Sequence, residues 1–506
     1  MDIPFDTLVS AAAALFSLKT LGLSVIGVMI GIVGGAMPGI SASVTIALVL
    51  PMTFVLDPLS ALVMLGAIYM SAEYGGSISA VLINTPGTPA AICTAMDGYP
   101  LSQQGRAREA LYMAVLGSSI GGFLGVVILL IFTPPLAALS LKFNSAEMFW
   151  LAIAGLAVVC NLSAKDFAKG VIAACIGLWL ATIGADPGSG YPRFSFGIYQ
   201  MEAPLPLIPM LLGFFAVSQM FNQLGRAELE APGTKAQPGA LIKTVMFALV
   251  RPFLILRSSL IGVMVGILPG AGASIASFVA YGEAKRWSSN PDEFGKGSPE
   301  GILASETSNN AMVGGSLVPL LAFGIPGSAS AAILLGALTI NGLIPGPDLF
   351  EYNGEIVYGF MLAFIPTVVA LYAVGTLATP VYSAILTIRP AFIIPSVLVL
   401  AFIGSFAVRG EVFDVGVATA CGLLGFVLLR SGFKIAPIIL GIVLGPLIEE
   451  NFIRSLTLVE TEGSVFQFFF GRPICQILIL ITITMVVSAF WREYRKPRST
   501  ARNTGK

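Results

Sequence analysis

The amino-acid sequence predicts an all-α, polytopic membrane protein made of inverted structural repeats with broken helices and helical hairpins. Of the 506 residues, 56% are hydrophobic and 11% are charged, whereas soluble domains carry about 25% charged residues. Several apolar runs reach the roughly 20 residues that a spanning helix needs, and they lack the alternation of barrel strands. Two motifs rich in glycine and proline also occur twice. Counting interrupted segments, we expect about 12 spanning or re-entrant segments.

Composition also excludes several classes of function. The chain has no histidine, which removes His-based zinc sites, haem ligation by histidine, and Ser-His-Asp or Cys-His catalysis. Asp186, in "GADPGSG", is the nearest candidate for a catalytic acid, and its surroundings indicate a loop. The formal net charge is zero, and no basic stripe indicates nucleic-acid binding. We therefore expect neither an enzyme nor a bound cofactor.

The repeated motifs stand in the same order in both halves. "GVMIGIVGGAMPGISAS" at 27–43 returns as "GVMVGILPGAGAS" at 262–274, with the second Pro-Gly pair 231 residues after the first. "GGSISAVLINTPGTPAA" at 75–91 resembles "GGSLVPLLAFGIPGSASAA" at 314–332, with the prolines of "TPG" and "IPG" 240 residues apart. Two motifs recurring at similar spacing favour an internal repeat over coincidence.

The motifs divide the chain into five segments. Residues 1–225 form the first repeat with its flanking helices, containing an entry motif at 27–55 and a hairpin motif at 73–100. The core of the second repeat spans 258–355, with the corresponding motifs at 262–284 and 305–345. Between them, 226–257 is predicted to be a basic, amphipathic cytoplasmic linker. Residues 356–490 add C-terminal helices without a clear counterpart, and 491–506 form a basic cytoplasmic tail.

The distribution of charge orients the two copies. Arg106 and Arg108 follow the first copy directly, and three basic residues at 243–257 precede the second. Because basic loops stay in the cytoplasm, the first copy ends there and the second begins there. "GPDLFEYNGE" at 346–355 is acidic and lacks lysine and arginine, so the second copy is expected to end outside. The two copies therefore run through the membrane in opposite directions.

Broken helices suggest what the repeats do. Lipid cannot hydrogen-bond exposed backbone, so irregular chain at membrane depth survives only inside protein or beside a wet cavity. Inverted repeats with matching Gly/Pro interruptions are typical of secondary transporters, whose substrate lies near the midplane where the repeats meet. "MPGISAS" and "LPGAGAS" are expected to expose backbone at a helix break, and "NTPGTPA" and "GIPGSAS" to form the tips of re-entrant hairpins. Half-helix N-termini attract anions, and the freed carbonyls coordinate Na⁺.

Polar residues beside the hairpin motifs are candidate cation ligands. Glu73 precedes the first hairpin motif and Glu306 precedes the second. Carboxylates inside a membrane are costly and usually functional, which makes both candidates for cation ligation, proton exchange or gating; the alternative is that each caps a helix at the interface. Asn309 and Asn310 offer amide groups for an ion or an anion, or for structural hydrogen bonds. Asp97, in "MDGYP", is expected in a turn.

At these residues the chain resembles the large membrane subunit of the tripartite tricarboxylate transporter family, a TctA-like permease. The resemblance covers nearly the whole length and rests on "PG" at 38–39, "EYGG" at 73–76, "NTPG" at 84–87, "MDGYPLSQQGR" at 96–106, "LPGAGAS", "FGKGSPEG" at 294–301, "SNNA" and "GIPGS". It implies a multi-pass permease of the bacterial inner membrane, with a cytoplasmic C-terminus. Its partners would be a small membrane subunit and a periplasmic solute-binding protein that delivers an organic carboxylate.

By motif match, the resemblance also assigns substrate-binding residues in four groups. These are Pro38, Gly39, Ser41 and Ser43; Asn84, Thr85, Pro86, Gly87 and Thr88; Pro269, Gly270, Gly272 and Ser274; and Gly324, Pro326, Gly327 and Ser328. No lysine or arginine lies in the four motifs, so co-transported Na⁺ or H⁺ is expected to balance the substrate charge. The predicted function is cation-coupled import of a tricarboxylate or related organic acid by alternating access. The alternative is a membrane scaffold or channel-like subunit whose Gly-rich helices only pack tightly.

Overall fold

The computed structural model describes residue 10 and residues 17–163, 167–224, 237–270, 272–382, 386, 390–462 and 464–494. Residues 226–236 of the predicted linker and residues 495–506 of the predicted basic tail therefore lie outside the described residues. Within them the chain is mostly helical, as predicted. Its described strands are β1 (Gly184–Ala185) and β2 (Pro192–Arg193), which form a two-stranded antiparallel ladder.

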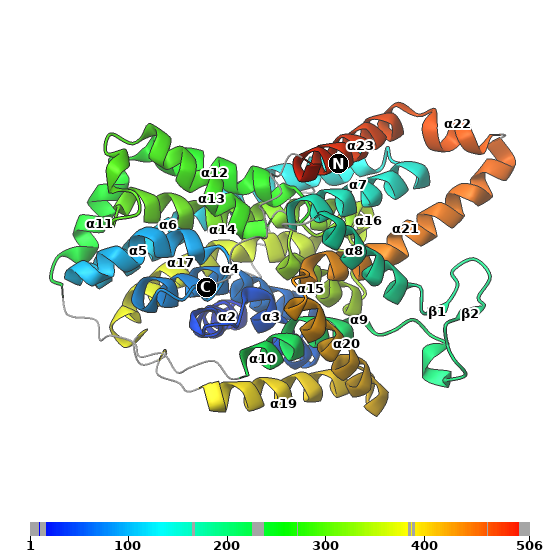
Figure 1. The fold of residues 1–506 in the computed structure, drawn as a ribbon, viewed down its shortest axis with the longest axis horizontal. Coiled ribbons are helices and arrows are strands. Elements are labelled where there is room, and N and C mark those ends of the chain that lie inside the picture. Colours follow the sequence, from blue (N-terminus) through cyan, green and yellow to red (C-terminus); the bar gives the residue numbers. More distant parts are fainter. Residues whose placement is uncertain are drawn as a thin grey trace, which may run out of the picture.

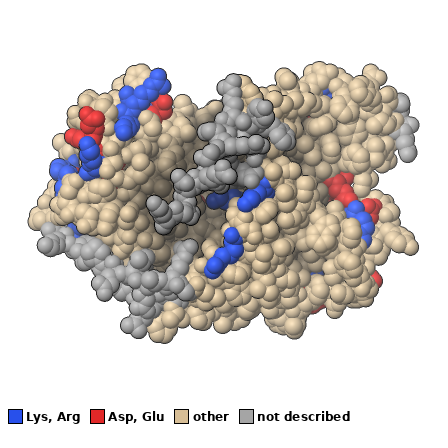
Figure 2. Space-filling model, viewed as in Figure 1, with Lys and Arg blue, Asp and Glu red and all other residues tan. Residues whose placement is uncertain are grey.

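The helices have the length and composition of a multi-pass membrane protein. Six are long and apolar enough to cross a bilayer, and a seventh crossing is possible where α11 (Ala240–Leu249) and α12 (Pro252–Ile267) meet at a bend of 80°. Several shorter apolar helices accompany them. Most of the face in Figure 2 carries no charged side chain, and the acidic and basic residues gather toward its two ends and near its centre. The number of spans remains a prediction.

The first motif copy forms two broken helical units. It comprises α2 (Leu18–Ala36), α3 (Ala42–Val49), the 3-10 helix η1 (Leu50–Val55), α4 (Pro58–Ile83), α5 (Ala91–Leu101), the π-helical η2 (Ser102–Arg106) and α6 (Ala107–Ser140). Between α2 and α3 the chain turns at Gly39, whose φ of +86° suits glycine. Ser41 then caps α3 by accepting a hydrogen bond from the Val44 N–H at 3.4 Å. α4 ends at Asn84 in the left-handed conformation, with φ +52°.

The second copy has the same order of elements. It comprises α12, α13 (Gly272–Trp287), the 3-10 helix η5 (Pro291–Glu293), α14 (Pro299–Phe323), α15 (Ala329–Ile340), α16 (Pro347–Tyr352) and α17 (Gly354–Leu377). α14 ends at Gly324, the position equivalent to Asn84, and its φ of +72° is again left-handed. Both predicted entry motifs are therefore broken helices, and both predicted hairpin motifs are turns between two helices.

Glycines let the broken helices approach the long ones closely. α2 packs against α4, and α12 packs against α14. A Cβ added at Gly35 would lie 2.1 Å from the carbonyl oxygen of Ala72, and one added at Gly266 would lie 2.5 Å from that of Met312. These two contacts join equivalent positions of the two motif copies. Much of the glycine in 27–35 and 262–266 thus serves close packing, whereas the breaks themselves come after it.

The remaining helices flank the two copies. They are α7 (Ser145–Ser163), α8 (Phe167–Ala181), the 3-10 helix η3 (Tyr199–Met201), α9 (Leu207–Leu212), the π-helical η4 (Gly213–Val217), α10 (Ser218–Gln223), the 3-10 helix η6 (Thr379–Val381), α19 (Pro390–Arg409), α20 (Val412–Arg430), α21 (Ile435–Glu462), α22 (Val465–Phe470) and α23 (Pro473–Tyr494). In Figure 1, α7, α8 and α21–α23 gather on the right, whereas α10, α19 and α20 lie along the lower edge. The elements of the two motif copies occupy the left and centre.

Two crossings among the flanking helices resemble each other. α21 packs on α8, and α20 packs on η4. A Cβ added at Gly441 would lie 2.5 Å from the carbonyl oxygen of Ala174, and one added at Gly213 would lie 2.4 Å from that of Ala418. In both crossings a glycine of one helix faces the backbone of the other.

Candidate functional site

Each hairpin tip folds back on its own long helix. The Gly87 N–H donates to the carbonyl oxygen of Gly76 at 3.1 Å, and the Gly327 N–H donates to that of Ser316 at 3.3 Å. Each tip also lies against the end of a broken helix, since a Cβ at Gly87 would lie 2.0 Å from the carbonyl oxygen of Gly35. Each tip and the neighbouring helix break thus form one packed unit.

The two units meet around α4 and α14. The Tyr69 hydroxyl on α4 lies 2.6 Å from the Ser328 Oγ and 3.0 Å from the Ser316 Oγ, so the first copy is hydrogen-bonded to the second hairpin. In the other direction, Ala90 of the first hairpin packs with Ala273 and Met312 of the second copy. α5 contacts α13 and α14, and α15 contacts α3 and α4. The structure therefore brings all four motifs together. Sequence reasoning missed Tyr69, although it stands 240 residues before Asn309, at the equivalent position.

A run of polar side chains crosses this junction on α14. Thr307, Ser308, Asn309 and Asn310 have no exposed surface. The Asn309 Nδ2 donates to the backbone carbonyl of Glu73 at 3.2 Å. Among the described residues, no partner is found for the hydroxyls of Thr307 and Ser308, the Asn309 Oδ1 or either polar atom of the Asn310 amide. A buried polar group without a hydrogen bond costs about 1–3 kcal/mol, so these groups mark where a polar ligand or ion would be stabilised.

Further polar groups without a partner among the described residues border the first hairpin tip and the first entry break. The Thr88 hydroxyl, at the first tip, is 1% exposed and has no partner among the described residues. Gln223 of α10 lies against the first entry break, because a Cβ at Gly39 would come within 2.2 Å of its Nε2. That nitrogen is also buried without a partner in the described part of the chain. At the second entry break the corresponding space beside Gly270 holds Val159. Gln223 was not among the predicted residues, because nothing in the sequence links α10 to this break.

Glu306 accepts hydrogen bonds from three helices of the first copy. Its carboxylate accepts from the Ser77 Oγ on α4 at 2.5 Å, from the Ser118 Oγ on α6 at 2.7 Å, and from the Thr94 Oγ1 on α5. Glu306 is fully buried, and Glu73 is 7% exposed. Both lie well inside long helices, so the alternative that they cap helices at the interface is wrong. No cluster of three or more His, Cys, Asp or Glu side chains that could hold a metal ion occurs among the described residues.

The other predicted substrate ligands fall into two sets. Those of the hairpin tips are mostly buried at the junction, namely Pro326, Gly87, Gly327, Thr88 and Ser328. The rest lie at the breaks, where Ser43 is buried, Asn84 is exposed and the others are half-buried. This set comprises Pro38, Gly39, Ser41, Ser43, Asn84, Thr85, Pro86, Pro269, Gly270, Gly272, Ser274 and Gly324. Asn84 is exposed and Ser41 serves as a helix cap, so both have a structural explanation. For both sets of residues, a role in substrate binding stays a prediction.

Asp97 does not lie in a turn as expected; it is fully buried on α5. One carboxylate oxygen accepts from the backbone N–H groups of Gly295, Gly297 and Ser298 at 2.7, 3.0 and 2.8 Å. The other accepts from the Tyr281 hydroxyl at 2.8 Å. The turn signal of "MDGYP" is overridden because this carboxylate finds partners far away in the sequence. Asp97 thereby fixes the "FGKGSPEG" segment against the first hairpin unit.

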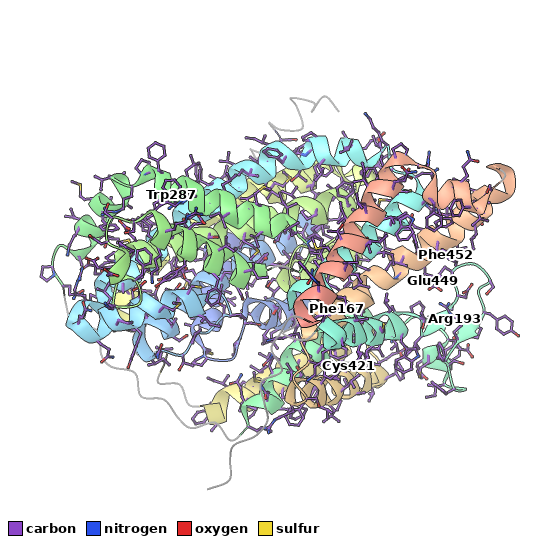
Figure 3. The ribbon with its side chains drawn as sticks, turned by 45° about the horizontal axis from the view of Figure 1, so that its top comes forward. Phe167, Arg193, Trp287, Cys421, Glu449 and Phe452 are labelled. Atoms are coloured by element: carbon purple, nitrogen blue, oxygen red, sulfur yellow. The ribbon has the colours of Figure 1, made fainter. Side chains whose placement is uncertain are left out.

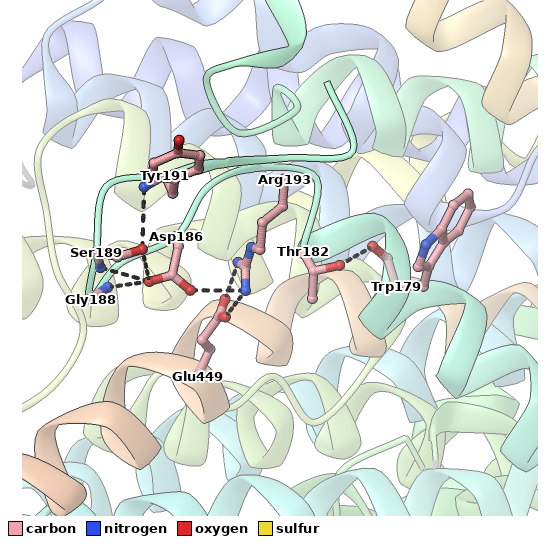
Figure 4. A network of polar contacts seen from close by, with 8 residues as sticks. All are labelled: Trp179, Thr182, Asp186, Gly188, Ser189, Tyr191, Arg193 and Glu449. Atoms are coloured by element: carbon pink, nitrogen blue, oxygen red, sulfur yellow. Dashed lines mark hydrogen bonds and ion pairs between the residues drawn. The ribbon is translucent and has the colours of Figure 1, made fainter. Parts of the chain in front are cut away.

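The loop that contains Asp186 is held by an ion-pair network, shown in Figure 4. The Arg193 Nη1 lies 2.5 Å from the Glu449 Oε1 and 3.1 Å from the Asp186 Oδ2. Hydrogen bonds from Ser189 and from the Gly188 N–H lower the pKa of the Asp186 carboxyl below its ordinary value. In Figure 3, Arg193 and Glu449 lie at the side of the molecule opposite Trp287. The predicted loop is confirmed, and it stands apart from the junction of the motifs.

The helical bundle and the buried polar junction define a polytopic membrane protein with paired broken helices. The chain belongs to the tripartite tricarboxylate transporter TctA family, whose sequence model matches residues 21–440. It is therefore a membrane subunit of a transporter family, as the resemblance implied.

Two proteins from Agrobacterium vitis are similar in sequence to this chain. An uncharacterized 52.8 kDa protein in the TAR-I ttuC' 3' region is 35% identical over 473 residues, which cover 94% of this chain and 93% of the relative. An uncharacterized protein in the TAR-II ttuC' 3' region is 33% identical over 237 residues, covering 47% of this chain and 97% of the relative. No solved structure matches the chain.

Proposed function

We propose that this chain is the large permease subunit of a secondary, cation-coupled importer of organic carboxylates in the bacterial inner membrane. It would work by alternating access with a small membrane subunit and a periplasmic solute-binding protein. The observation that carries the proposal is the meeting of four chain breaks around buried polar groups, among them those of Thr88 and Asn310, that have no hydrogen-bond partner in the described part of the chain.

The junction suits an anion because of the helix ends around it. α3, α5, α13 and α15 each begin beside a break, and helix N-termini present free N–H groups and a positive dipole end. The motifs supply no lysine or arginine, so the charge of a bound carboxylate would be balanced by a co-transported cation. Glu73, Glu306, Asn309 and Asn310 supply oxygen atoms for it or a site for a proton.

Matching contacts in the two halves support the proposal of inverted repeats. The left-handed ends of α4 and α14, the hydrogen bonds at the two tips and the glycine contacts of α2 and α12 recur at equivalent positions. The crossings of α8 with α21 and of η4 with α20 suggest that the repeat extends into the C-terminal helices. Opposite orientation predicts that cysteines placed at Ser102 and Asn353, in a chain without native cysteines, react from opposite sides of the membrane. Reaction from one side would discard the inversion.

Uptake measurements test the function. Proteoliposomes with all three subunits should accumulate at least one labelled di- or tricarboxylate, and Na⁺ and pH gradients identify the coupling ion. Valine at Gly39, Asn84, Gly270 or Gly327 should abolish uptake while membrane insertion persists. Gly22→Val is the matched control, because a Cβ there meets nothing within 4 Å. If all four variants transport normally, the assignment of the site is wrong.

The competing function is a scaffold or channel-like subunit. The close glycine packing of α2 on α4 and of α12 on α14 favours it, since such packing needs no substrate. A complex that assembles fully but accumulates no carboxylate under any ion gradient would decide for this alternative.

A further inference from the structure

The two carboxylates at the motif junction lie on facing turns of α4 and α14 but have different surroundings. Ser77, one turn after Glu73 on α4, donates to the Glu306 carboxylate, and Asn309, one turn after Glu306 on α14, donates to the backbone carbonyl of Glu73. Glu306 has no exposed surface and Glu73 retains 7%. Two negative charges in a poorly solvated interior repel each other, and one of them is then favoured in its neutral, protonated form.

The hydrogen bonds decide which of the two stays charged. The Glu306 carboxylate accepts from three hydroxyl groups, those of Ser77, Thr94 and Ser118. Hydrogen bonds to the charged form stabilise it. These three hydrogen bonds favour the ionised form at Glu306 over the ionised form at Glu73.

Glu73 lacks this support. No hydrogen bond or ion pair to its carboxylate is found among the described residues; only its backbone carbonyl is engaged, by Asn309. Asn310 lies four residues after Glu306 and so on the same face of α14. Its buried amide has no partner for either polar atom in the described chain. A carboxyl group that lacks such hydrogen bonds and lies beside a second carboxylate is the one that takes up a proton.

Among the residues that the structure describes, no lysine or arginine forms an ion pair with Glu73. The other charged or titratable groups on helices packed against α4 are Lys19 of α2, which pairs with Asp57; Cys93, Asp97 and Tyr99 of α5; Arg108, Glu109 and Tyr112 of α6; Glu300 of α14; and Glu355, Tyr358 and Tyr372 of α17. The two acids among them that are buried, Asp97 and Glu109, are engaged by the "FGKGSPEG" backbone and by Arg106.

We propose that Glu73 carries the co-transported proton and that Glu306 is its permanently ionised partner. This inference rests on the proposed import of a carboxylate and identifies the coupling ion as H⁺. Glu73 lies three residues before Gly76, whose carbonyl oxygen holds the first hairpin tip, so its charge is close to the substrate end of the junction. A neutral Glu73 favours a bound anion, and by linkage the bound anion favours the proton on Glu73. The carboxyl group gains its proton on the side where substrate enters and releases it as substrate leaves.

Proton flux in proteoliposomes holding the complete complex tests the proposal. In the wild type, addition of a transported carboxylate should drive proton entry that a trapped pH dye reports. Glu73→Gln mimics the protonated form, so exchange of internal for external substrate should persist while accumulation driven by a pH gradient falls about tenfold or more. Glu73→Asp should retain coupling. Glu355→Gln is the matched control, since this glutamate is exposed on α17, and it should behave as wild type.

Infrared spectroscopy provides a readout that a merely structural role would not change. At neutral pH the wild type should show a protonated carboxyl band that Glu73→Gln lacks and Glu355→Gln keeps. Sodium-driven uptake without proton flux, a wild type without this band, or coupled uptake by Glu73→Gln would each overturn the proposal and leave carboxylate import standing. A wild-type complex that moves no carboxylate under any gradient would overturn both. If Glu73→Gln does not fold, the proposal is decided by three other measurements: proton flux in the wild type, the protonated carboxyl band of the wild type, and coupled uptake by Glu73→Asp.

Discussion

Replacing Gly87 by alanine tests whether the first hairpin tip must lie against α2. Gly87 is buried, and a Cβ there would lie 2.0 Å from the carbonyl oxygen of Gly35 and 2.9 Å from the Cα of Gly76. Ordinary contacts begin at 3.4 Å, so the tip would have to move by about 1.4 Å (3.4 − 2.0). Both obstacles are backbone atoms of packed helices, which cannot rotate away as a side chain can.

The expected loss of stability follows from this overlap. Overpacking a buried site costs about 1–3 kcal/mol, and displacing the tip also weakens the hydrogen bond between Gly87 and Gly76, worth about 1 kcal/mol. We expect Gly87→Ala to lower the free energy of unfolding by about 2–4 kcal/mol. Thermal unfolding of the purified chain and carboxylate uptake by the assembled complex measure this effect, and both should fall.

Two comparisons make the result interpretable. Gly327→Ala should act in the same direction, because its Cβ would lie 2.2 Å from the carbonyl oxygen of Gly266. Gly22→Ala meets nothing within 4 Å, and alanine is favoured over glycine in a helix by about 0.5–1 kcal/mol, so its melting temperature should stay or rise slightly. Wild-type melting and uptake for Gly87→Ala would show that the tip does not pack on α2.

Three further perturbations have defined outcomes. Tyr69→Phe removes the hydroxyl that contacts Ser328 and should cost about 1–3 kcal/mol in thermal unfolding; an unchanged melting temperature would refute that contact. Asp97→Asn weakens the hold on residues 295–298, so trypsin should cut at 296 about tenfold faster, a change of about 1.4 kcal/mol, whereas a control at the exposed Asp292 should not change the rate. The pKa of Asp186 is lowered by its hydrogen bonds to Ser189 and Gly188, so the ionised form stabilises the loop above the ordinary aspartate value of about 3.9. Protection of these amides from hydrogen exchange should be lost as the pH falls below that value, and protection that persists in acid would contradict the assignment.

The breaks of the helices could be predicted because their causes are local. Adjacent proline and glycine at 38–39, 86–87, 269–270 and 326–327 favour a helix break at each position, and the duplication of these pairs made chance unlikely. The meeting of the breaks was predicted only through the transporter hypothesis. The contacts that produce it, such as Tyr69 with Ser328, join residues 259 apart in sequence.

The partners of the buried acids could not be predicted. Ser77, Thr94 and Ser118 lie on three helices, 188 to 229 residues from Glu306. Serine and threonine in helices usually bond to the preceding turn, so nothing in the sequence distinguishes these three hydroxyls from the rest. The prediction of a turn at Asp97 was wrong for the same reason. The backbone N–H groups that bind its carboxylate lie about 200 residues later in the sequence, where a local turn signal gives no sign of them. Asn84 shows the reverse case, because the tolerance of asparagine for the left-handed conformation gives it a local structural role.

An experimental structure of the complete complex with a carboxylate bound tests the central claim most directly. We expect the carboxylate to lie between the two hairpin tips, within hydrogen-bond distance of the Thr88 and Ser328 side chains or of the Asn310 amide. A carboxylate bound elsewhere, with the four motif segments continuing as unbroken helices that face lipid, would contradict it.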